Sequence, residues 1–420
     1  MTTDRPVPEI RAYDAARDFA SVARIWREVR WIEPGEDAEK PLTEFLSNGE
    51  GEVGIANGEA ECFVHRTLGD ITYDSTQLPL CAVTGVTTSQ VGRKQGFATA
   101  LTARALRHGA EAGAAVAALG MFEQGFYNRF GFGTGGYDHF ITFDPSTLRV
   151  DHVPYRAPVR LGADDIPDMF QAVQRRHRHH CAVTLDSPTS LGAEIAWANH
   201  PFTLGYRDDS GRLTHFLSGD LANENGPFKL HFVIYETPEQ LMELLRLLRE
   251  LGDQIHAVKI PEPPELSLQT LLDAPVRQRS RSRKSELASG IESLAWWQLR
   301  VLDVPACVAA RRWSGEAFAF TLELSDPLED RLVEAGFTAG WSGVGGSYTI
   351  TVGADSGAAV GGDTTLPTLT TDVGTFSRLW FGVESASALR TLGALTAPDA
   401  LCISLDESLR LGRAVTGYPF

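Results

Sequence analysis

The first part of the chain alternates between two spacings of hydrophobic residues. Between residues 14 and 30 the apolar side chains recur every three or four positions, which predicts an amphipathic helix. β-prone runs predict strands at residues 52–57, 60–67 and 79–88, and Asn57-Gly58 predicts a tight hairpin between the first two. Together these spacings favour a mixed α/β fold.

The later patterns extend this mixed fold along the whole chain. The first block is completed by an acidic loop at 33–39, a helix at 93–112 and strands at 116–121 and 138–143. A second block repeats the order, with a strand near 158–161, a helix at 166–178, strands at 202–206, 212–217 and 229–234, and a helix at 238–251. A third, α+β block begins near residue 294, with strands at 296–302 and 318–324 and helices at 304–311 and 377–381.

The composition is that of a soluble globular protein. A chain of 420 residues suggests two to four domains, and 43% hydrophobic with 22% charged residues is ordinary for a folded protein. The sequence has no apolar run of about 18 residues that would span a bilayer and no signal-peptide core near Met1. Its five cysteines lie far apart, which predicts neither a disulfide framework nor a Cys-x-x-Cys metal site. We therefore expect a cytoplasmic protein without a membrane partner.

The net charge limits the kinds of partner that the protein is expected to bind. The formal net charge of −16 argues against nucleic acid and favours a cationic substrate, such as an amine or a polyamine. The run His177-Arg178-His179-His180-Cys181 invites a metal site, but neighbouring histidines on a helix diverge and no second ligand cluster is apparent. A solvated helix end without metal is expected there. The basic stretch 277–284 is expected to be an exposed, solvated loop.

Residues 86–101 carry the strongest functional signal. The strand ends in Val86-Thr87-Thr88 and a short polar turn follows. The run Arg93-Lys94-Gln95-Gly96-Phe97-Ala98-Thr99 then opens an alanine- and leucine-rich helix. A helix start directs several backbone N–H groups and the positive end of the helix dipole to one place. A glycine at such a start lets a ligand approach the main chain closely. This junction predicts a site for a phosphate or a pyrophosphate.

The spacing of Arg93, Gly96 and Ala98 indicates which class of phosphate-containing ligand this site binds. Arg-x-x-Gly-x-Ala resembles the acetyl-coenzyme-A signature of the GNAT acetyltransferases. It lacks the Gly-Lys-Ser/Thr end of a P-loop and the Gly-x-Gly-x-x-Gly of a dinucleotide site. The alternative interpretation is an ordinary surface turn before a helix.

Tyr127 is the candidate acid. It stands in Gln124-Gly125-Phe126-Tyr127-Asn128-Arg129-Phe130-Gly131-Phe132, which resembles the Tyr-x-x-x-Gly-Phe pattern that ends many GNAT domains. Acetyl transfer from a thioester releases a thiolate, and a nearby phenol can protonate it or donate a hydrogen bond to it. A plain core aromatic is the alternative. The chain carries no nucleophile motif such as Gly-x-Ser-x-Gly, which agrees with direct transfer to an amine.

Longer matches point to one family within the GNAT enzymes. The stretches 86–101 and 126–132, the run Trp297-Gln298-Leu299-Arg300-Val301-Leu302-Asp303-Val304-Pro305-Ala306 and the terminal Phe420 resemble the enhanced-intracellular-survival (Eis) family over nearly the full length. This resemblance implies tandem GNAT folds and a C-terminal domain like sterol carrier protein. The expected domains are 1–152, which binds acetyl-CoA, 153–290, which lacks the cofactor motif, and 291–420.

The resemblance also implies a function and a set of site residues. It implies a hexamer that acetylates amines, including aminoglycosides. Pantetheine would run along residues 86–88, pyrophosphate would lie on residues 94–99, and the thioester would lie near Phe122 and Glu123. Tyr127 would be the general acid and the terminal carboxylate of Phe420 the general base. Burial would raise the pKa of such a carboxylate above its solution value near ~3.5 and make it a better base.

The sequence therefore predicts an acetyl-CoA-dependent N-acetyltransferase acting on a cationic small molecule. Two alternatives stay open. One is a non-catalytic binding or oligomer-forming protein with a degenerate GNAT pair. The other is a protein-lysine acetyltransferase with the same machinery.

Overall fold

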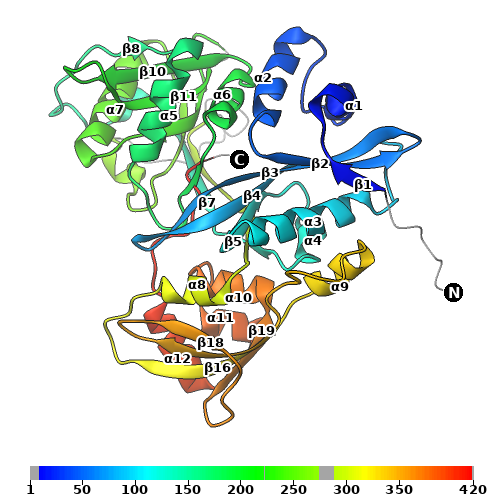
Figure 1. The fold of residues 1–420 in the computed structure, drawn as a ribbon. Helices are drawn as coiled ribbons and strands as arrows, with labels where there is room; N and C mark the ends of the chain where they lie inside the picture. Colours follow the sequence, from blue (N-terminus) through cyan, green and yellow to red (C-terminus); the bar gives the residue numbers. More distant parts are fainter. Residues whose placement is uncertain (1–8, 222, 274–287, 419–420) are drawn as a thin grey trace.

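The computed structural model describes residues 9–221, 223–273 and 288–418. Figure 1 shows three parts: a first α/β unit (blue to cyan) and a second (green) lie next to each other, and a third (yellow to red) lies below them. The last described residues return from the third part to the junction of the first two. This return brings the C-terminal segment close to the candidate site.

The first sheet has the strand order β1-β2-β3-β4-β5-β15-β6, and β9 pairs with β3. The antiparallel hairpin turn at Asn57 and Gly58 has φ values of 53° and 84°, as the Asn-Gly signal predicts. Between β4 and the parallel strand β5 runs α3, whose apolar side packs on the sheet. The elements are β1 (Ile10–Ala12), α1 (Ala15–Glu28), α2 (Glu36–Leu46), β2 (Glu50–Ala56), β3 (Glu59–Tyr73), β4 (Thr76–Thr88), α3 (Phe97–Glu111), β5 (Val116–Gly120), α4 (Gln124–Asn128), β6 (Gly133–Thr134), β9 (Val183–Leu185) and β15 (Trp297–Val301).

The second sheet has the order β14-β7-β13-β12-β11-β10-β8 and repeats the plan of the first. Three antiparallel strands, β10 (Pro201–Arg207), β11 (Leu213–Leu221) and β12 (Phe228–Ile234), lead into α7 (Pro238–Glu250) and then the parallel strand β13 (Val258–Pro261). This order matches β2-β3-β4-α3-β5. The unit also contains β7 (Asp138–Phe143), β8 (Val159–Arg160), α5 (Ile166–Arg175), α6 (Pro188–Ala196) and β14 (Gly290–Leu294).

The third part is built on a sheet with the order β18-β17-β16-β19-β20. An ion pair between Arg300 of β15 and Asp326 is fully buried and joins this part to the first sheet. Arg300 also donates a hydrogen bond to the carbonyl of Phe130. The elements are α8 (Val304–Ala309), β16 (Phe318–Ser325), α9 (Leu328–Glu334), β17 (Gly346–Val352), β18 (Gly357–Val360), β19 (Thr368–Asp372), α10 (Val373–Trp380), α11 (Ala386–Thr391), β20 (Leu395–Thr396) and α12 (Asp399–Ser408).

Some expectations from the sequence are wrong. The acidic stretch 33–39 is not all loop, because α2 begins at Glu36 and packs Leu42 and Phe45 into the core. The expected helix at 166–178 stops at Arg175, since Arg176 leaves helical geometry with ψ 156°. The strand at 138–143 joins the second sheet, and the strand at 297–301 joins the first. Strand pairing over such distances has no local signal in the sequence.

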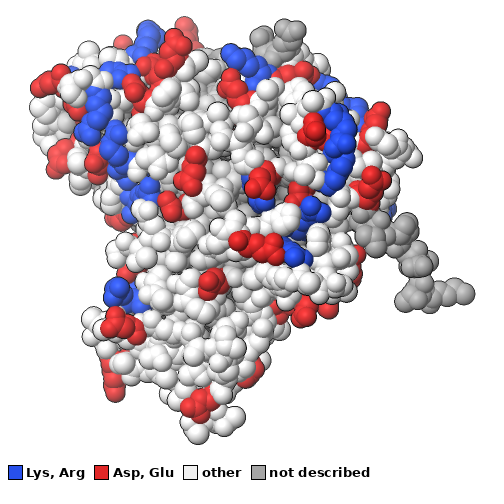
Figure 2. Space-filling model, viewed as in Figure 1, with Lys and Arg blue, Asp and Glu red and all other residues white. Residues whose placement is uncertain are grey.

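Charges are mixed on the surface. Figure 2 shows acidic and basic side chains interleaved over the two upper units, while much of the third part is uncharged on this face. Among the described residues, no helix combines the length and the hydropathy needed to cross a bilayer.

Candidate active site

The start of α3 leaves main-chain donors without a partner. Gly96 is the N-cap, with φ 89°, and no side chain caps the helix. The N–H of Ala100 donates to the carbonyl of Gly96 at 3.0 Å and makes the first intrahelical bond. The N–H groups of Phe97, Ala98 and Thr99 therefore point out of the helix end. This is the geometry that binds phosphate groups.

Positive charge and backbone shape support an anion here. Lys94 and Gly96 both have positive φ, 63° and 89°. A Cβ on Gly96 would meet no atom within 4 Å, so the left-handed backbone, rather than crowding, favours glycine at this position. Arg93 and Lys94 are exposed, and within the described residues neither forms an ion pair. Both side chains are available for a polyanionic ligand.

A gap opens between the two central strands of the first sheet. β4 pairs with β5 only at residues 80–82, opposite residues 116–118. Beyond this point the strands diverge, and the β4 edge that faced β5 has no strand partner among the described residues. Unpaired main-chain groups on such an edge can bind an extended ligand as an added strand would.

A β-bulge bends β4 where the gap begins. Phe63 pairs with Thr87 and His65 with Thr84, so Gly85 and Val86 together face one residue of β3. Gly85 has φ 62°, the left-handed conformation that this kind of bulge needs. The bulge turns the end of β4 away from the regular sheet and widens the gap.

The gap leads into a cavity of about 420 Å³. Its walls are the bulged part of β4, the end of β5 with the following turn, α4, α1 with the loop after it, α2, and α6 from the second unit. The lining residues are Trp26, Trp31, Phe45, Val83, Thr84, Gly85, Val86, Gly120, Met121, Phe122, Tyr127, Glu194 and Trp197. The strand gap that would hold a donor and this cavity thus form one continuous space.

Tyr127 lies in the wall of this cavity. It belongs to the short helix α4, whose N-cap Glu123 accepts a hydrogen bond from the N–H of Gly125 at 3.0 Å. The side chain of Tyr127 is buried, and its hydroxyl has no hydrogen-bond partner in the described residues. Burial, followed by the charges of Cys62 and Glu123, raises the pKa of Tyr127 to about 12. The phenol therefore keeps its proton at physiological pH.

The wall opposite the strands is aromatic and carries one carboxyl group. Trp26 packs against Trp31, Phe45 and Trp197, with ring centroids 5.1 to 5.8 Å apart. Glu194 and Trp197 come from α6 and its C-cap, in the second unit. Burial raises the pKa of the Glu194 carboxyl to about 7. Within the described residues this carboxyl has neither a hydrogen bond nor an ion pair.

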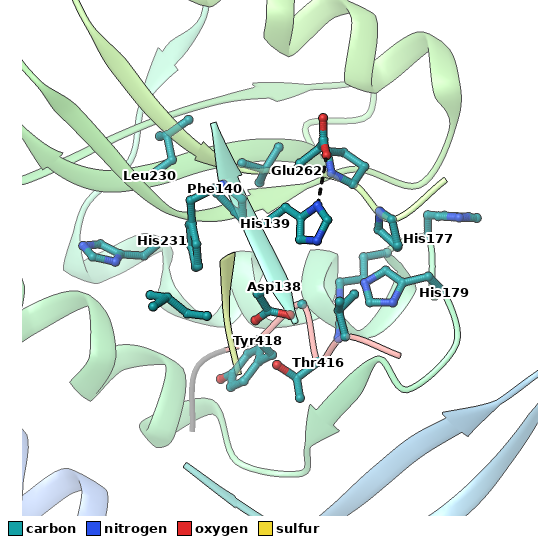
Figure 3. A pocket seen from close by; sticks show the side chains of 18 of the residues that line it. Asp138, His139, Phe140, His177, His179, Leu230, His231, Glu262, Thr416 and Tyr418 are labelled. Atoms are coloured by element: carbon teal, nitrogen blue, oxygen red, sulfur yellow. Dashed lines mark ion pairs between the residues drawn. The ribbon is translucent and has the colours of Figure 1, made fainter. Parts of the chain in front are cut away.

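A second cavity, of about 290 Å³, lies in the second unit, where β12 and β13 take the places of β4 and β5 (Figure 3). The C-terminal residues 415–418 form part of its wall, and Figure 3 shows Thr416 and Tyr418 below Asp138. The carbonyl of Thr416 accepts a hydrogen bond from the N–H of Val183 at 2.9 Å.

The buried ring of Tyr418 fixes this C-terminal segment. It packs edge-on against Phe232, with centroids 5.7 Å apart, and faces the guanidinium of Arg176 at 5.9 Å. The pKa of Tyr418 is raised, first by burial and second by the charge of Glu194. Residues 415–418 therefore lie near the Glu194 side of the first cavity.

The residues expected to bind the donor occupy four places in the first unit. Val86, Thr87 and Thr88 end β4; Arg93, Lys94, Gln95 and Gly96 form the turn; Phe97, Ala98 and Thr99 open α3; and Phe122 and Glu123 follow β5. The Thr87 and Phe97 side chains are buried, so only their main chain faces the site. Phe420 lies outside the described residues, as does the basic stretch 277–284.

Three functional features escaped the sequence analysis. Glu194 and Trp197 lie in another unit, about 70 positions from Tyr127, and belong to no motif. Gly85 is the exception, because an isolated glycine inside a strand pattern often indicates a bulge. Long-range packing alone brings these residues together.

The histidine run is not a solvated helix end. α5 ends before it, and His180 is buried: its Nδ1 accepts from the N–H of Asp74 at 3.0 Å, and its Nε2 lies 3.0 Å from the carbonyl of Phe381. Among the described residues, no three His, Cys, Asp or Glu side chains are grouped as metal ligands would be.

Comparison with known families agrees with this geometry. Residues 9–135 match the family described as acetyltransferase (GNAT) domain, and residues 304–413 match the sterol carrier protein domain. The chain is therefore an N-acetyltransferase of the GNAT type with a sterol-carrier-protein-like C-terminal domain. GNAT acetyltransferases use acetyl-CoA as the acetyl donor.

Relatives span most of the chain. It is 26% identical over 354 residues, 79% of its length, to an uncharacterized N-acetyltransferase of Streptomyces avermitilis, of which 78% is covered. A probable N-acyltransferase of Enterococcus faecalis has the same fold (TM-score 0.79, 17% identity, 98% of this chain and 99% of that one). So has Eis1 of Mycobacterium abscessus (TM-score 0.75, 19% identity, 98% and 100%).

Proposed function

We propose that this protein transfers the acetyl group of acetyl-CoA to an amino group of a cationic small molecule, such as an aminoglycoside-like or polyamine-like amine. One observation carries the proposal: the gap between β4 and β5 and the side chain of Tyr127 line one cavity, and the uncapped start of α3 follows the end of β4 at this gap. A donor-binding site and an acceptor cavity are thereby joined at the tyrosine.

The donor would follow the divergent strands. Its pyrophosphate would accept hydrogen bonds from the main-chain N–H groups of residues 94–99, with Arg93 and Lys94 beside it. Its pantetheine arm would bind along residues 86–88 as an added strand. The thioester would then lie near Phe122 and Glu123, within reach of the cavity.

The transfer needs no covalent enzyme intermediate. The amine nitrogen bonds to the acetyl carbon, the carbon–sulfur bond breaks, sulfur leaves as a thiolate, and the nitrogen loses one proton. Tyr127 donates a hydrogen bond to the sulfur as its charge develops. Because the pKa of Tyr127 is about 12, whereas that of an alkyl thiol is near ~8.5, hydrogen bonding is favoured over complete proton transfer.

We propose the terminal carboxylate of Phe420 as the base that takes the amine proton. Tyr418 is buried, and its pKa responds to the charge of Glu194, which lines the acceptor cavity. Two residues further along a chain reach at most about 7 Å. An added C-terminal segment would convert the α-carboxylate of Phe420 into a peptide bond, which is not a base, and should lower kcat with acetyl-CoA affinity unchanged.

Several finer expectations remain proposals. We propose membership of the Eis family, with hexamer formation and a cytoplasmic location. We also propose the domain division 1–152, 153–290 and 291–420, in which the first domain contributes β7 to the second sheet and the third domain contributes β15 to the first sheet. The Eis1 fold match supports the family proposal, and the sterol carrier protein match supports a separate third domain.

The donor site is tested by a matched pair of variants at the two ends of α3. Gly96 and Gly113 both have positive φ, at 89° and 93°, and at both positions a Cβ would project into open space. Gly96→Ala and Gly113→Ala should each cost ~1–2 kcal/mol of stability. Only Gly96→Ala should weaken acetyl-CoA binding in calorimetry, by ~10-fold or more. Equal affinities for both variants would contradict the donor site.

Binding and activity assays on the same protein distinguish the two alternative functions that the sequence left open. Absence of acetyl-CoA binding would favour a degenerate GNAT pair that only binds ligands or assembles. Acetylation of lysine peptides in preference to small amines would favour a protein acetyltransferase.

A further inference from the structure

The acceptor cavity is completed by the second unit, which has no donor motif of its own. α6 contributes Glu194 and, at its C-cap, Trp197. Ser187 caps this helix by accepting from the N–H of Ser190 at 3.1 Å. The amide of Asn48 donates to the hydroxyl of Thr189 at 2.6 Å and links α6 to the segment after α2.

Packing fixes the orientation of α6 further. Ala193 is fully buried in the hydrophobic cluster that contains Trp26 and Phe45. Glu194, the next residue, lines the cavity together with Trp26, Trp31 and Trp197. Its carboxyl group is therefore held in a wall of large aromatic rings rather than at a mobile surface.

This wall combines two features that attract an ammonium group. Among the described residues that line the cavity, Glu194 is the only acidic one. None of the others is a lysine or arginine that could balance its charge. Indole faces attract cations, and more strongly where water is excluded. A partly buried carboxylate without a partner is unfavourable in the free enzyme and gains from a cationic ligand.

The same wall limits the number of charges on the ligand. The other described lining residues are aromatic, aliphatic or neutral polar, and none can compensate a second or third ammonium group. A polycation would leave desolvated charges without partners. A flat apolar body, by contrast, would pack on the tryptophan rings.

We infer that Glu194 binds the ammonium group of the acceptor and that the preferred acceptor is a primary monoamine with a flat, apolar body. This inference rests on the proposed function and narrows the acceptor from cationic amines in general to arylalkyl monoamines. Glu194 pairs with the ammonium form of the amino group that is acetylated, and that group gives one proton to solvent before the neutral amine attacks. The amide product is neutral and cannot form the ion pair again, which favours its release.

The test compares wild type and Glu194→Gln with 2-phenylethylamine as acceptor. At pH 7.5 the variant should raise KM by ~30-fold or more and change kcat by less than ~3-fold. At pH 9.5, where more of the amine is neutral, the difference in KM should shrink to a few fold. Two other titratable groups, Tyr127 and Tyr418, lie near Glu194. Both have raised pKa values and stay neutral as the pH changes from 7.5 to 9.5.

Binding without turnover gives a second readout. Wild type should bind 2-phenylethylamine more tightly than 2-phenylethanol, and Glu194→Gln should bind the two alike. Glu44→Gln changes an exposed acid on α2, the helix beside α6, and serves as the matched control with wild-type behaviour. Glu194→Asp should recover part of the lost affinity.

The possible results contradict different claims, so they can be told apart. A kcat/KM for spermidine or kanamycin above that for 2-phenylethylamine would overturn the monoamine class. A loss of kcat without a rise in KM for Glu194→Gln would overturn ammonium binding by Glu194. Failure of acetyl-CoA to bind the wild-type protein would instead contradict the proposed function itself.

Discussion

The two α/β units start their equivalent helices in opposite ways. In the first unit α3 begins at Gly96 with no side-chain cap. In the second, α7 begins with a capping box: Thr237 accepts from the N–H of Gln240, and the Gln240 side chain accepts from the N–H of Thr237. Pro238 has no N–H, and Glu239 adds negative charge to the first turn. One helix start is available to an anion, and the other is already satisfied by the protein.

The gaps between strands beside these two helices also differ: one is open to a ligand and the other is partly filled by the protein. Both β4 and β12 are irregular against the preceding strand, so both units carry a bulge near the gap. In the first unit the gap continues into the cavity with Tyr127. In the second, the C-terminal residues 415–418 help to line the opening. Under the proposed function the repeated fold serves two tasks: one copy binds the donor, and the other supports residues 415–418 and the wall of the first cavity.

The largest expected effect concerns Tyr127, in the wall of the first unit's gap. Tyr127→Phe removes the hydrogen bond to the leaving sulfur and should lower kcat by ~100-fold or more. The affinity for acetyl-CoA should change by less than ~3-fold, as measured by calorimetry. Full turnover in this variant would remove Tyr127 from the reaction.

The next largest effect comes from making α3 resemble α7. Ala98→Glu places a carboxylate at the position that Glu239 occupies in α7. It should stabilise the helix by ~0.5 kcal/mol through the dipole, yet repel a pyrophosphate and weaken acetyl-CoA binding by ~100-fold. Glu239→Ala is the control and should leave binding unchanged. Unaltered binding to Ala98→Glu would place the donor elsewhere.

A smaller effect is expected on stability at Glu194. Its folded pKa of about 7 exceeds the ordinary value of 4.5, so the folded chain binds this proton more tightly than the unfolded chain. Stability must therefore fall as pH rises from about 4.5 through about 7, by up to ~3 kcal/mol. Glu194→Gln should be ~2 kcal/mol more stable than wild type in urea at pH 8 and nearly equal to it at pH 5. Equal stabilities at pH 8 would contradict a desolvated, unpaired carboxylate.

The smallest effect is expected at the bulge of β4. A Cβ at Gly85 would lie 3.3 Å from the ring of Trp26, and the residue has φ 62°. Gly85→Ala should destabilise the protein by ~1–2 kcal/mol and raise KM for the acceptor, because Trp26 lines the cavity. Thermal unfolding and steady-state kinetics measure the two effects. A KM equal to that of wild type would separate the bulge from the acceptor site.

The sequence predicts local features of this fold well. Asn57-Gly58 identified the hairpin because both residues tolerate positive φ, and the spacing of Leu241, Leu244, Leu245 and Leu248 identified α7. The Arg93-to-Ala98 motif identified a helix start whose N–H groups are indeed uncapped.

Features that depend on distant contacts were not predictable in this way. β15 and β7 join sheets far from their sequence neighbours, because pairing depends on which edge is free rather than on local pattern. His180 became buried between the segment after β3 and the third part. Glu194 reaches the cavity only because α6 packs beside α2, which no residue of α6 signals alone.

The central claim is that the first unit binds the donor at α3 and the second does not bind it at α7. Calorimetric titration of the wild-type protein with acetyl-CoA tests this claim most directly. We predict one acetyl-CoA per chain, lost in Ala98→Glu and retained in Glu239→Ala. Two molecules per chain, or one that survives Ala98→Glu, would contradict it.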